Sequence, residues 1–368
     1  MNTHHPDHPN WQPPHCPNET CKHHNDLHES WRYKKNGFFR RLYDGRRIRR
    51  FICHACGVSF SSQSFKPDYY LKRPDILPQL MTLSVGAMAN RQIADHLGVS
   101  PSTIDRQLQR LGRQCLLFHA EMMKKLETPQ LIAIDGFESF ELSQYYPFDL
   151  HTAVAPDAGF FLWYTDSPRR RKGAMTPEQK ERRKELESLF GRPDPQAVRK
   201  DVQELLGAVI REGSELTLRS DDHTSYRPAI RAIRAIINHE VTPSKAYRSR
   251  HNQLFEINLL DGLIRHGEAN HRRETWAWAK RRGMTALRIA VFLVWRNYIR
   301  RRWKKGPRAT PAMQIGLTDR PLKVEEIIGT RLFVARVGLK GRWAQYYWGL
   351  VQTPALGVNR MHRLTKAA

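Results

Sequence analysis

The chain has 368 residues, enough for two or three domains, and 40% of them are apolar, which can fill at least one sizeable core. Lysine and arginine total 61 against 36 aspartates and glutamates, so the formal net charge is +25. Such an excess favours a polyanionic partner, and nucleic acid is the first candidate. Because no apolar run is long enough to span a membrane and the N-terminus lacks a signal-peptide pattern, we expect a cytoplasmic protein with no membrane partner.

The residue pattern changes several times along the chain, and each change suggests a domain boundary. Residues 1–14 are polar and rich in His and Pro, which predicts a disordered tail, and residues 15–66 contain four of the five cysteines. Apolar residues recur at helical spacing over residues 75–127. The pattern over residues 130–305 is typical of an α/β domain, and residues 306–368, where clear periodicity is lost, form a C-terminal extension.

Within the α/β domain, the hydrophobic pattern predicts five strands. They are expected near residues 131–135, 150–154, 159–164, 216–221 and 235–241. An amphipathic helix is expected over 201–212, and the chain from 253 to 303 is mostly helical. This order predicts a mixed sheet with helices packed on it. A very basic insertion at 168–200 is either a solvated helix face with charge pairs or a DNA-contacting surface.

Two short-spaced cysteine pairs predict a small metal-binding domain. Cys16 and Cys21 form the first pair, and Cys53 and Cys56, followed by Gly57, form the second. In a reducing compartment such pairs favour a tetrahedral zinc site over disulfides. Four histidines are weaker candidates as ligands: His15, His23, His24 and His54. The segment between the pairs mixes apolar and basic residues, as a zinc ribbon does, and its arginines favour DNA as the partner, although a ribbon can also brace the next domain.

Residues 91–108 have the pattern of a helix-turn-helix. Gly98 fits the left-handed position of the turn, and Ser100 followed by Pro101 fits the start of the second helix. That second helix would then present a set of side chains to the major groove of double-stranded DNA: Ser102, Thr103, Arg106 and Gln107. The alternative is an ordinary helical hairpin, which the strongly basic composition makes less favourable.

Two of the predicted strands end in an acid, Asp135 and Asp221. A carboxylate at the end of a buried strand is costly unless a positive group meets it. Two such acids on one sheet and a third on a nearby helix would form a site for Mg²⁺, or Mn²⁺, that activates a nucleophile for DNA cleavage. Asp261, at the start of the helix after the last strand, is the first choice for the third acid, with Glu268 and Glu274 next.

The order of ribbon, helix-turn-helix, strand-Asp, strand-Asp and helix-acid resembles bacterial insertion-sequence transposases of the DDE class. Within them it is most similar to the group with an N-terminal zinc ribbon. The resemblance covers residues 15 to about 305 and is carried by the four cysteines, residues 91–108, and the following residues and segment: Asp135, Asp221, Tyr226, Asn258, Asp261 and 274–281. The family usually has Glu as its third acid, where this chain has Asp.

The resemblance implies an RNase-H-like fold for the α/β domain. It also implies an enzyme that binds the ends of a mobile element as a homo-oligomer, cuts DNA with magnesium held by Asp135, Asp221 and Asp261, and joins the freed 3′-hydroxyl to target DNA. Two other functions remain open at this point. One is a non-catalytic regulator that uses only the ribbon and the helix-turn-helix, and the other, less favoured, is a zinc protein that binds RNA.

Overall fold

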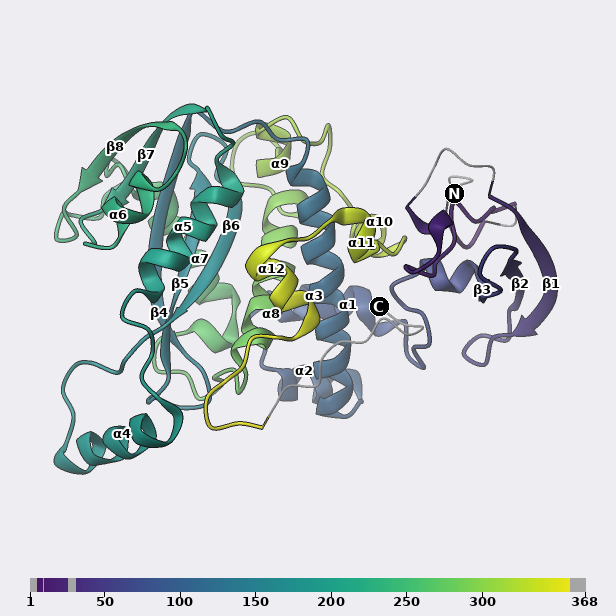
Figure 1. Cartoon of the computed structure of the whole chain (residues 1–368), viewed down its shortest axis with the longest axis horizontal. Coiled ribbons are helices and arrows are strands. Elements are labelled where there is room, and N and C mark those ends of the chain that lie inside the picture. The colour runs from purple at the N-terminus through teal and green to yellow at the C-terminus, as the bar shows by residue number, and fades with distance from the viewer. Residues whose placement is uncertain (1–4, 9, 26–30, 358–368) are drawn as a thin grey trace.

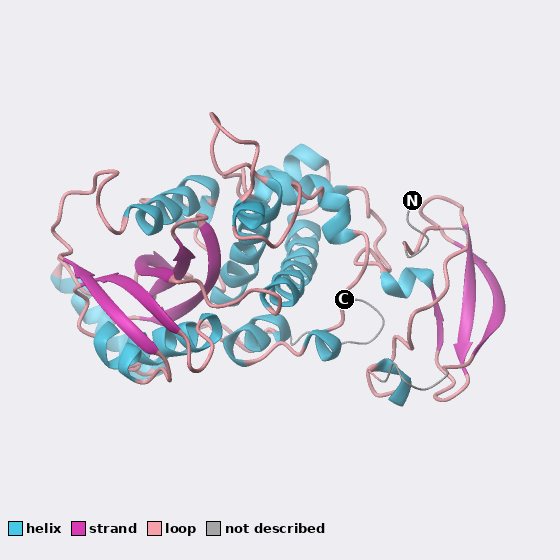
Figure 2. Cartoon of the chain, turned by 90° about the horizontal axis from the view of Figure 1, so that it is seen from above, coloured by secondary structure: helices cyan, strands magenta, loops and turns pink. Residues whose placement is uncertain are grey.

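The computed structural model describes residues 5–8, 10–25 and 31–357. Three parts follow one another along its longest axis: a mixed sheet with its helices, a bundle of helices, and a small separate sheet (Figures 1 and 2). In this described part of the chain, no helix combines the length and the apolar character needed to cross a membrane.

The larger sheet has five strands in the order β6-β5-β4-β7-β8. Their bounds are β4 Leu131–Phe140, β5 Pro147–Ala155, β6 Phe160–Pro168, β7 Glu215–Asp221 and β8 Ile236–Thr242. The first three strands in sequence pair antiparallel, and β7 and β8 run parallel to β4. This confirms the predicted mixed α/β fold, with an RNase-H-like sheet preceded by a small sheet and a helix-turn-helix.

Helices cover both faces of this sheet. On one face α7 (Phe255–Gly267) contacts β4 and β5, and its Asp261 accepts a hydrogen bond from Thr152. On the other face Asp201 of α5 (Ala197–Val209) accepts one from Ser167, which is in turn bonded to His151. Consecutive strand residues such as 151 and 152 point to opposite faces, so α5 and α7 lie on opposite sides. Coverage on both faces explains why β5 is buried along its whole length.

The predicted helix-turn-helix comprises α1 (Ile76–Ser84), α2 (Asn90–Leu97) and the long α3 (Pro101–Met123). Most of α3 lies beyond the motif and packs along α8 (Arg282–Val294), in the middle of the molecule (Figure 1). The contact is close: a Cβ on Gly112 would lie 2.6 Å from the Leu287 carbonyl oxygen. Buried residues of the helix-turn-helix and of the sheet therefore belong to one continuous hydrophobic core.

The C-terminal segment, which the sequence suggested as an extension, packs on this shared core. Its helices are α9 Pro311–Gln314, α10 Val324–Ile328, α11 Val334–Val337 and α12 Gly341–Trp348. From α12, the ring of Tyr346 stacks on Tyr164 of the edge strand β6, and the Trp343 indole donates to the Tyr164 carbonyl at 3.0 Å. Arg342 of the same helix forms an ion pair with Asp201.

The small sheet contains β1 (Tyr33–Arg40), β2 (Arg47–Cys53) and β3 (Ser59–Ser61), all antiparallel. Short 3-10 turns at Lys22–His24 and Ser62–Phe65 flank it. Its separate aromatic core includes Trp11, whose ring centroid lies 5.2 Å from that of Phe65. The expectation of a disordered tail over 1–14 therefore fails at Trp11, because the indole has a hydrophobic surface to cover.

The basic insertion after β6 forms the helix α4 (Pro177–Phe190), which has no buried residue. It projects from the carboxyl end of the sheet in Figure 1. Glu187 forms ion pairs with three arginines of this segment: Arg170, Arg183 and Arg192. The structure thus gives this helix the solvated face with charge pairs that was one of the two interpretations of its sequence.

Linking helices complete the α/β domain. Helix α6 (Tyr226–Arg231) connects β7 to β8, a 3-10 turn at Ala269–His271 follows α7, and a π-helical turn at Trp295–Ile299 ends α8.

Candidate functional site

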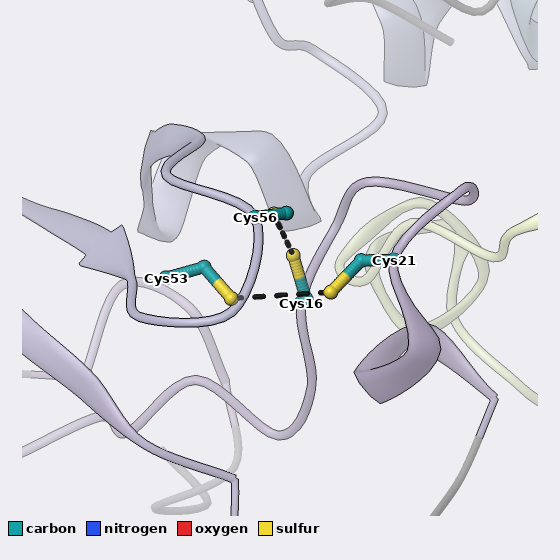
Figure 3. A group of neighbouring side chains, drawn as sticks. All are labelled: Cys16, Cys21, Cys53 and Cys56. Carbon is teal, nitrogen blue, oxygen red and sulfur yellow. Dashed lines mark hydrogen bonds between the residues drawn. The ribbon is translucent and has the colours of Figure 1, made fainter.

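The four N-terminal cysteines converge on one point from two turns of the chain (Figure 3). Their sulfurs all lie within 4.8 Å of one another, with Sγ–Sγ distances of 3.6 Å for Cys16–Cys56 and 4.0 Å for Cys21–Cys53. Zinc–sulfur bonds of about 2.3 Å in a tetrahedron place the sulfurs about 3.8 Å apart. The cluster therefore fits a structural zinc ion.

The neighbouring histidines have other partners. His15 and His24 both place Nδ1 at hydrogen-bond distance from the Cys16 carbonyl oxygen, at 3.0 and 2.8 Å, and their rings pack against Phe333. These two rings brace the first cysteine turn, and the four thiols supply a complete ligand set.

The turn between α2 and α3 has the geometry that its sequence predicted. Gly98 has a φ of 61°, in the left-handed region, and its backbone N–H closes α2. Pro101 occupies the first turn of α3. The Ser100 side chain makes no capping bond to the backbone and instead contacts the hydroxyls of Ser102 and Thr103, at 3.1 and 2.9 Å.

The four side chains expected to face DNA differ in their exposure. Ser102 and Arg106 are exposed, and Thr103 is half-buried. Gln107 is only 3% exposed, and its amide donates to the Arg73 carbonyl oxygen at 3.2 Å. It ties α3 to the chain before α1 and is not presented to a groove, because its position on α3 faces inward.

Asp135 and Asp221 lie at matching positions on two neighbouring parallel strands, β4 and β7. The pairing of β4 with β7 ends at Ala133 and Arg219, and the same register continued by two residues brings Asp135 beside Asp221, in agreement with the effect of the Asp221 charge on Asp135. Opposed residues of paired strands point to the same face, and the strands lie about 4.8 Å apart. The two carboxylates therefore share one face at the carboxyl end of β7.

The helix α7 brings Asp261 to the same place. On the side of β4 away from β7, Asp135 is paired with Thr152 of β5. The Thr152 hydroxyl donates a hydrogen bond to Asp261 Oδ1 at 3.0 Å. Asp261 is 8% exposed. Asp221, Asp135 and Thr152 thus lie side by side on three neighbouring strands, and Thr152 is hydrogen-bonded to Asp261. The three acids form a group on one face of the sheet, the carboxylate cluster.

The electrostatics of the carboxylate cluster show that its members interact. The pKa of Asp135 is raised to about 6, chiefly by burial and also by the neighbouring Asp221 charge, while the hydrogen bond from the Gly136 N–H acts to lower it. Burial and then the Asp135 charge hold the pKa of Asp261 well above its usual range. At longer range, the charge of Arg248 opposes both rises. Like charges thus stand close together in a site where a cation would relieve their repulsion.

The two competing candidates for the third acid lie elsewhere. Glu268 is fully buried and pairs with Arg288 of α8. The same guanidinium donates to the carbonyls of Ser84 and Met88 at 2.8 Å each, so Glu268 helps to fix the helix-turn-helix on the core. Glu274 is exposed in the loop between α7 and α8.

Sequence reasoning missed two participants of this site, Thr152 and Arg248. Thr152 lies in the middle of an apolar strand, and only its hydrogen bond to Asp261 of α7 shows that it supports this acid. Arg248 is one of many arginines in the chain, and only the fold places its charge near Asp135 and Asp261.

Comparison with known proteins supports DNA binding by the segment that contains the helix-turn-helix. Residues 72–114 match the family model described as bacterial regulatory protein, arsR family. This range holds α1, α2 and the first half of α3, so the chain carries a helix-turn-helix DNA-binding domain. No curated protein sequence matches the chain.

One similar solved structure is the cryo-electron-microscopy structure of the simian T-cell lymphotropic virus intasome in complex with the PP2A regulatory subunit B56 gamma. The match has 10% sequence identity and covers 52% of this chain and 57% of that chain, with a TM-score of 0.23. At so low a TM-score the match establishes no shared fold.

Proposed function

We propose that this chain is a DNA transposase of the DDE class, which binds the ends of a mobile element and cuts and joins DNA strands with the help of magnesium. The observation that carries the proposal is the carboxylate cluster: Asp135 and Asp221 level on adjacent strands, with Asp261 bonded to Thr152 beside them. A helix-turn-helix in the same chain supports DNA as the substrate.

The carboxylate cluster fits divalent cations of the hard, oxygen-preferring kind. Its side chains offer only oxygen ligands, and mutual repulsion together with burial raises the pKa of two of them. Their oxygens do not all lie within 4.8 Å of one another, in contrast to the cysteine sulfurs. That spread is compatible with two ions about 3.5–4 Å apart, each held by part of the set.

When bound, two such ions stabilise both the attacking and the leaving oxygen of a phosphodiester exchange. The residues of this chain hold the ligands in place. The Gly136 N–H donates to Asp135 Oδ1 at 2.7 Å and the His223 N–H to Asp221 Oδ1 at 3.0 Å, while Thr152 orients Asp261. The charge of Arg248 would offset part of the negative charge of Asp135 and Asp261 when no metal is bound.

The helix-turn-helix would position the element end. Ser102, Thr103 and Arg106 at the start of α3 are the residues we propose to meet the major groove, with Gln107 holding α3 in place. Two element ends must be brought together for transfer, so we further propose that the active form is a homo-oligomer assembled on DNA.

The test is a strand-cleavage assay, in the presence of magnesium, on the DNA that flanks the coding sequence of this chain. Asp135→Asn and Asp221→Asn should each reduce cleavage by about 100-fold or more, since each removes a metal ligand and the loss of a group that merely supports a ligand already costs about 10–100-fold. The matched control is Asp222→Asn, an exposed neighbour that should keep wild-type activity. Cleavage retained by either of the first two variants would overturn the assignment.

A second candidate function is a DNA-binding regulator without catalysis. The family-model match over residues 72–114 favours it, because that model describes regulatory proteins. It predicts that the wild type binds flanking DNA tightly, that magnesium brings no cleavage, and that Asp135→Asn binds DNA as the wild type does.

A further inference from the structure

The zinc-binding ribbon carries a groove that the proposed function has not used. The groove has a volume of about 530 Å³ and lies between the N-terminal segment and the hairpin of β1 and β2. Its lining includes four cations and three aromatic rings: Lys35, Arg46, Arg47, Arg49, Trp11, Phe38 and Phe51. The ribbon lies at the end of the molecule opposite the larger sheet (Figure 1), so this groove is remote from the carboxylate cluster.

Two of the cations are held in defined positions. The guanidinium carbons of Arg47 and Arg49 each lie 4.1 Å from the centroid of the Phe38 ring. A register shift between Lys35 and Phe38 in β1 leaves Phe38 opposite Arg49 of β2. Contact with the ring fixes each guanidinium without consuming its N–H donors, because a cation–π contact uses the face of the group. The donors stay available for an anion.

The acidic side chain in the lining does not neutralise the positive charge of the groove. Its acid, Asp7, receives a hydrogen bond from Lys66 at 2.7 Å and lies 3.7 Å from Arg46. Over the described residues, neither Arg47 nor Arg49 forms an ion pair with a carboxylate. The lining therefore keeps an excess of positive charge that an anionic ligand can neutralise.

The aromatic rings of the groove leave little for a nucleobase to stack on. Trp11 is 9% and Phe51 5% exposed, because both pack in the core of the ribbon, and Phe38 already carries the two guanidiniums. What the groove offers is a row of guanidinium donors, whose planar fork matches the geometry of phosphate oxygens.

We propose that this groove binds the phosphodiester backbone of duplex DNA without reading its sequence. It would extend the contact made by the helix-turn-helix to a second stretch of backbone, with Arg47 and Arg49 as the main contacts. The proposal rests on the DNA-binding part of the proposed function and is independent of cleavage by the carboxylate cluster.

The experiment measures the salt dependence of duplex binding with the full-length, zinc-loaded chain. Fluorescence anisotropy gives Kd between about 50 and 200 mM salt for a flanking-DNA duplex, for an unrelated duplex of equal length, and for single-stranded DNA and RNA probes. The test variant is Arg47→Gln/Arg49→Gln. The matched control is Lys34→Gln/Arg50→Gln, which removes the same charge from exposed positions of the same two strands outside the groove.

Each lost phosphate contact lowers the slope of log Kd against log salt by about 0.9. The test variant should therefore lose about 1.8 in slope and bind both duplexes more weakly by the same factor, about tenfold or more at 100 mM salt. The control should change the slope by less than about 0.5. Zinc content and thermal midpoint of each variant establish that the ribbon is intact.

Three results would overturn the proposal. A wild-type slope in the test variant means that the groove does not touch DNA. A loss confined to the flanking duplex means base reading, and a loss confined to single-stranded DNA or RNA probes means a different ligand. The failure of the proposed catalysis can be told apart from these results. In that case Asp135→Asn would cleave like the wild type, while the slopes of log Kd against log salt for the arginine variants would stay as predicted.

Discussion

Replacing Asp135 by asparagine should stabilise the metal-free protein at pH 8 and leave its stability nearly unchanged at pH 4. The structure raises the pKa of this carboxyl from an ordinary 3.8 to about 6, by burial and by the charge of Asp221. Between these two values the folded protein keeps a proton that the unfolded chain has lost. Stability therefore falls as pH rises through this window and stays low above it.

The size of the effect follows from the same pKa. A rise of about 2 in the pKa of Asp135 corresponds to about 3 kcal/mol, and the partial exposure of this side chain to solvent reduces the effect to about 1–3 kcal/mol. Asparagine resembles the protonated acid, so at pH 8 the variant should gain about that much over the wild type. Buried acids away from the carboxylate cluster, such as Glu268, are common to both proteins and cancel in the comparison.

Urea unfolding followed by tryptophan fluorescence, in buffer prepared without magnesium, measures this difference at both pH values. Adding magnesium at pH 8 should raise the stability of the wild type and not that of Asp135→Asn, because only the wild type retains the ligand. Asp222→Asn serves as the control and should change stability little at either pH. A variant no more stable than the wild type at pH 8 would refute the picture of repelling carboxylates.

Three other predictions concern the scaffold. Gly112→Ala should destabilise the protein to urea by about 1–3 kcal/mol, because its Cβ would lie 2.6 Å from a backbone oxygen of α8, while Gly207→Ala, with open space around it, should be neutral or stabilising by about 0.5–1 kcal/mol; equal effects would contradict the close packing. Cys53→Ser should reduce the zinc measured by a colorimetric chelator after denaturation, whereas Cys115→Ala, away from the cluster, should keep one zinc per chain; full zinc in Cys53→Ser would exclude the four-cysteine site. Arg288→Met should lower the free energy of unfolding in urea by about 3–5 kcal/mol, because the substitution leaves the buried carboxylate of Glu268 without its partner. A decrease below about 1 kcal/mol would argue against this ion pair.

Local patterns predicted the elements of this chain well, because their causes lie within short segments. Alternation and apolar runs located the five strands of the larger sheet, and the Gly98 turn with Pro101 located the helix-turn-helix. The spacing of the cysteines identified the four residues that the fold brings together. In each of these cases the residues that determine the structure are neighbours in sequence.

Long-range packing set the limits of prediction. The segment after residue 306 has little hydrophobic periodicity, because its short helices depend on contacts with distant parts of the chain. The stacking of Tyr346 on Tyr164 is one such contact. Gln107 occupies a helix position that suits a groove contact, yet the fold turns it toward Arg73. The sequence ranked Asp261 ahead of Glu268 and Glu274 by position alone, and only the fold shows that Asp261 is the acid that reaches Thr152 across the sheet.

The most direct test of the central claim is a crystal structure of the protein soaked with Mn²⁺, with the ions located by anomalous scattering. Two manganese sites are expected about 3.5–4 Å apart, one held by Asp135 and Asp221 and one by Asp135 and Asp261. Anomalous peaks at surface carboxylates with none at Asp135 would contradict that claim.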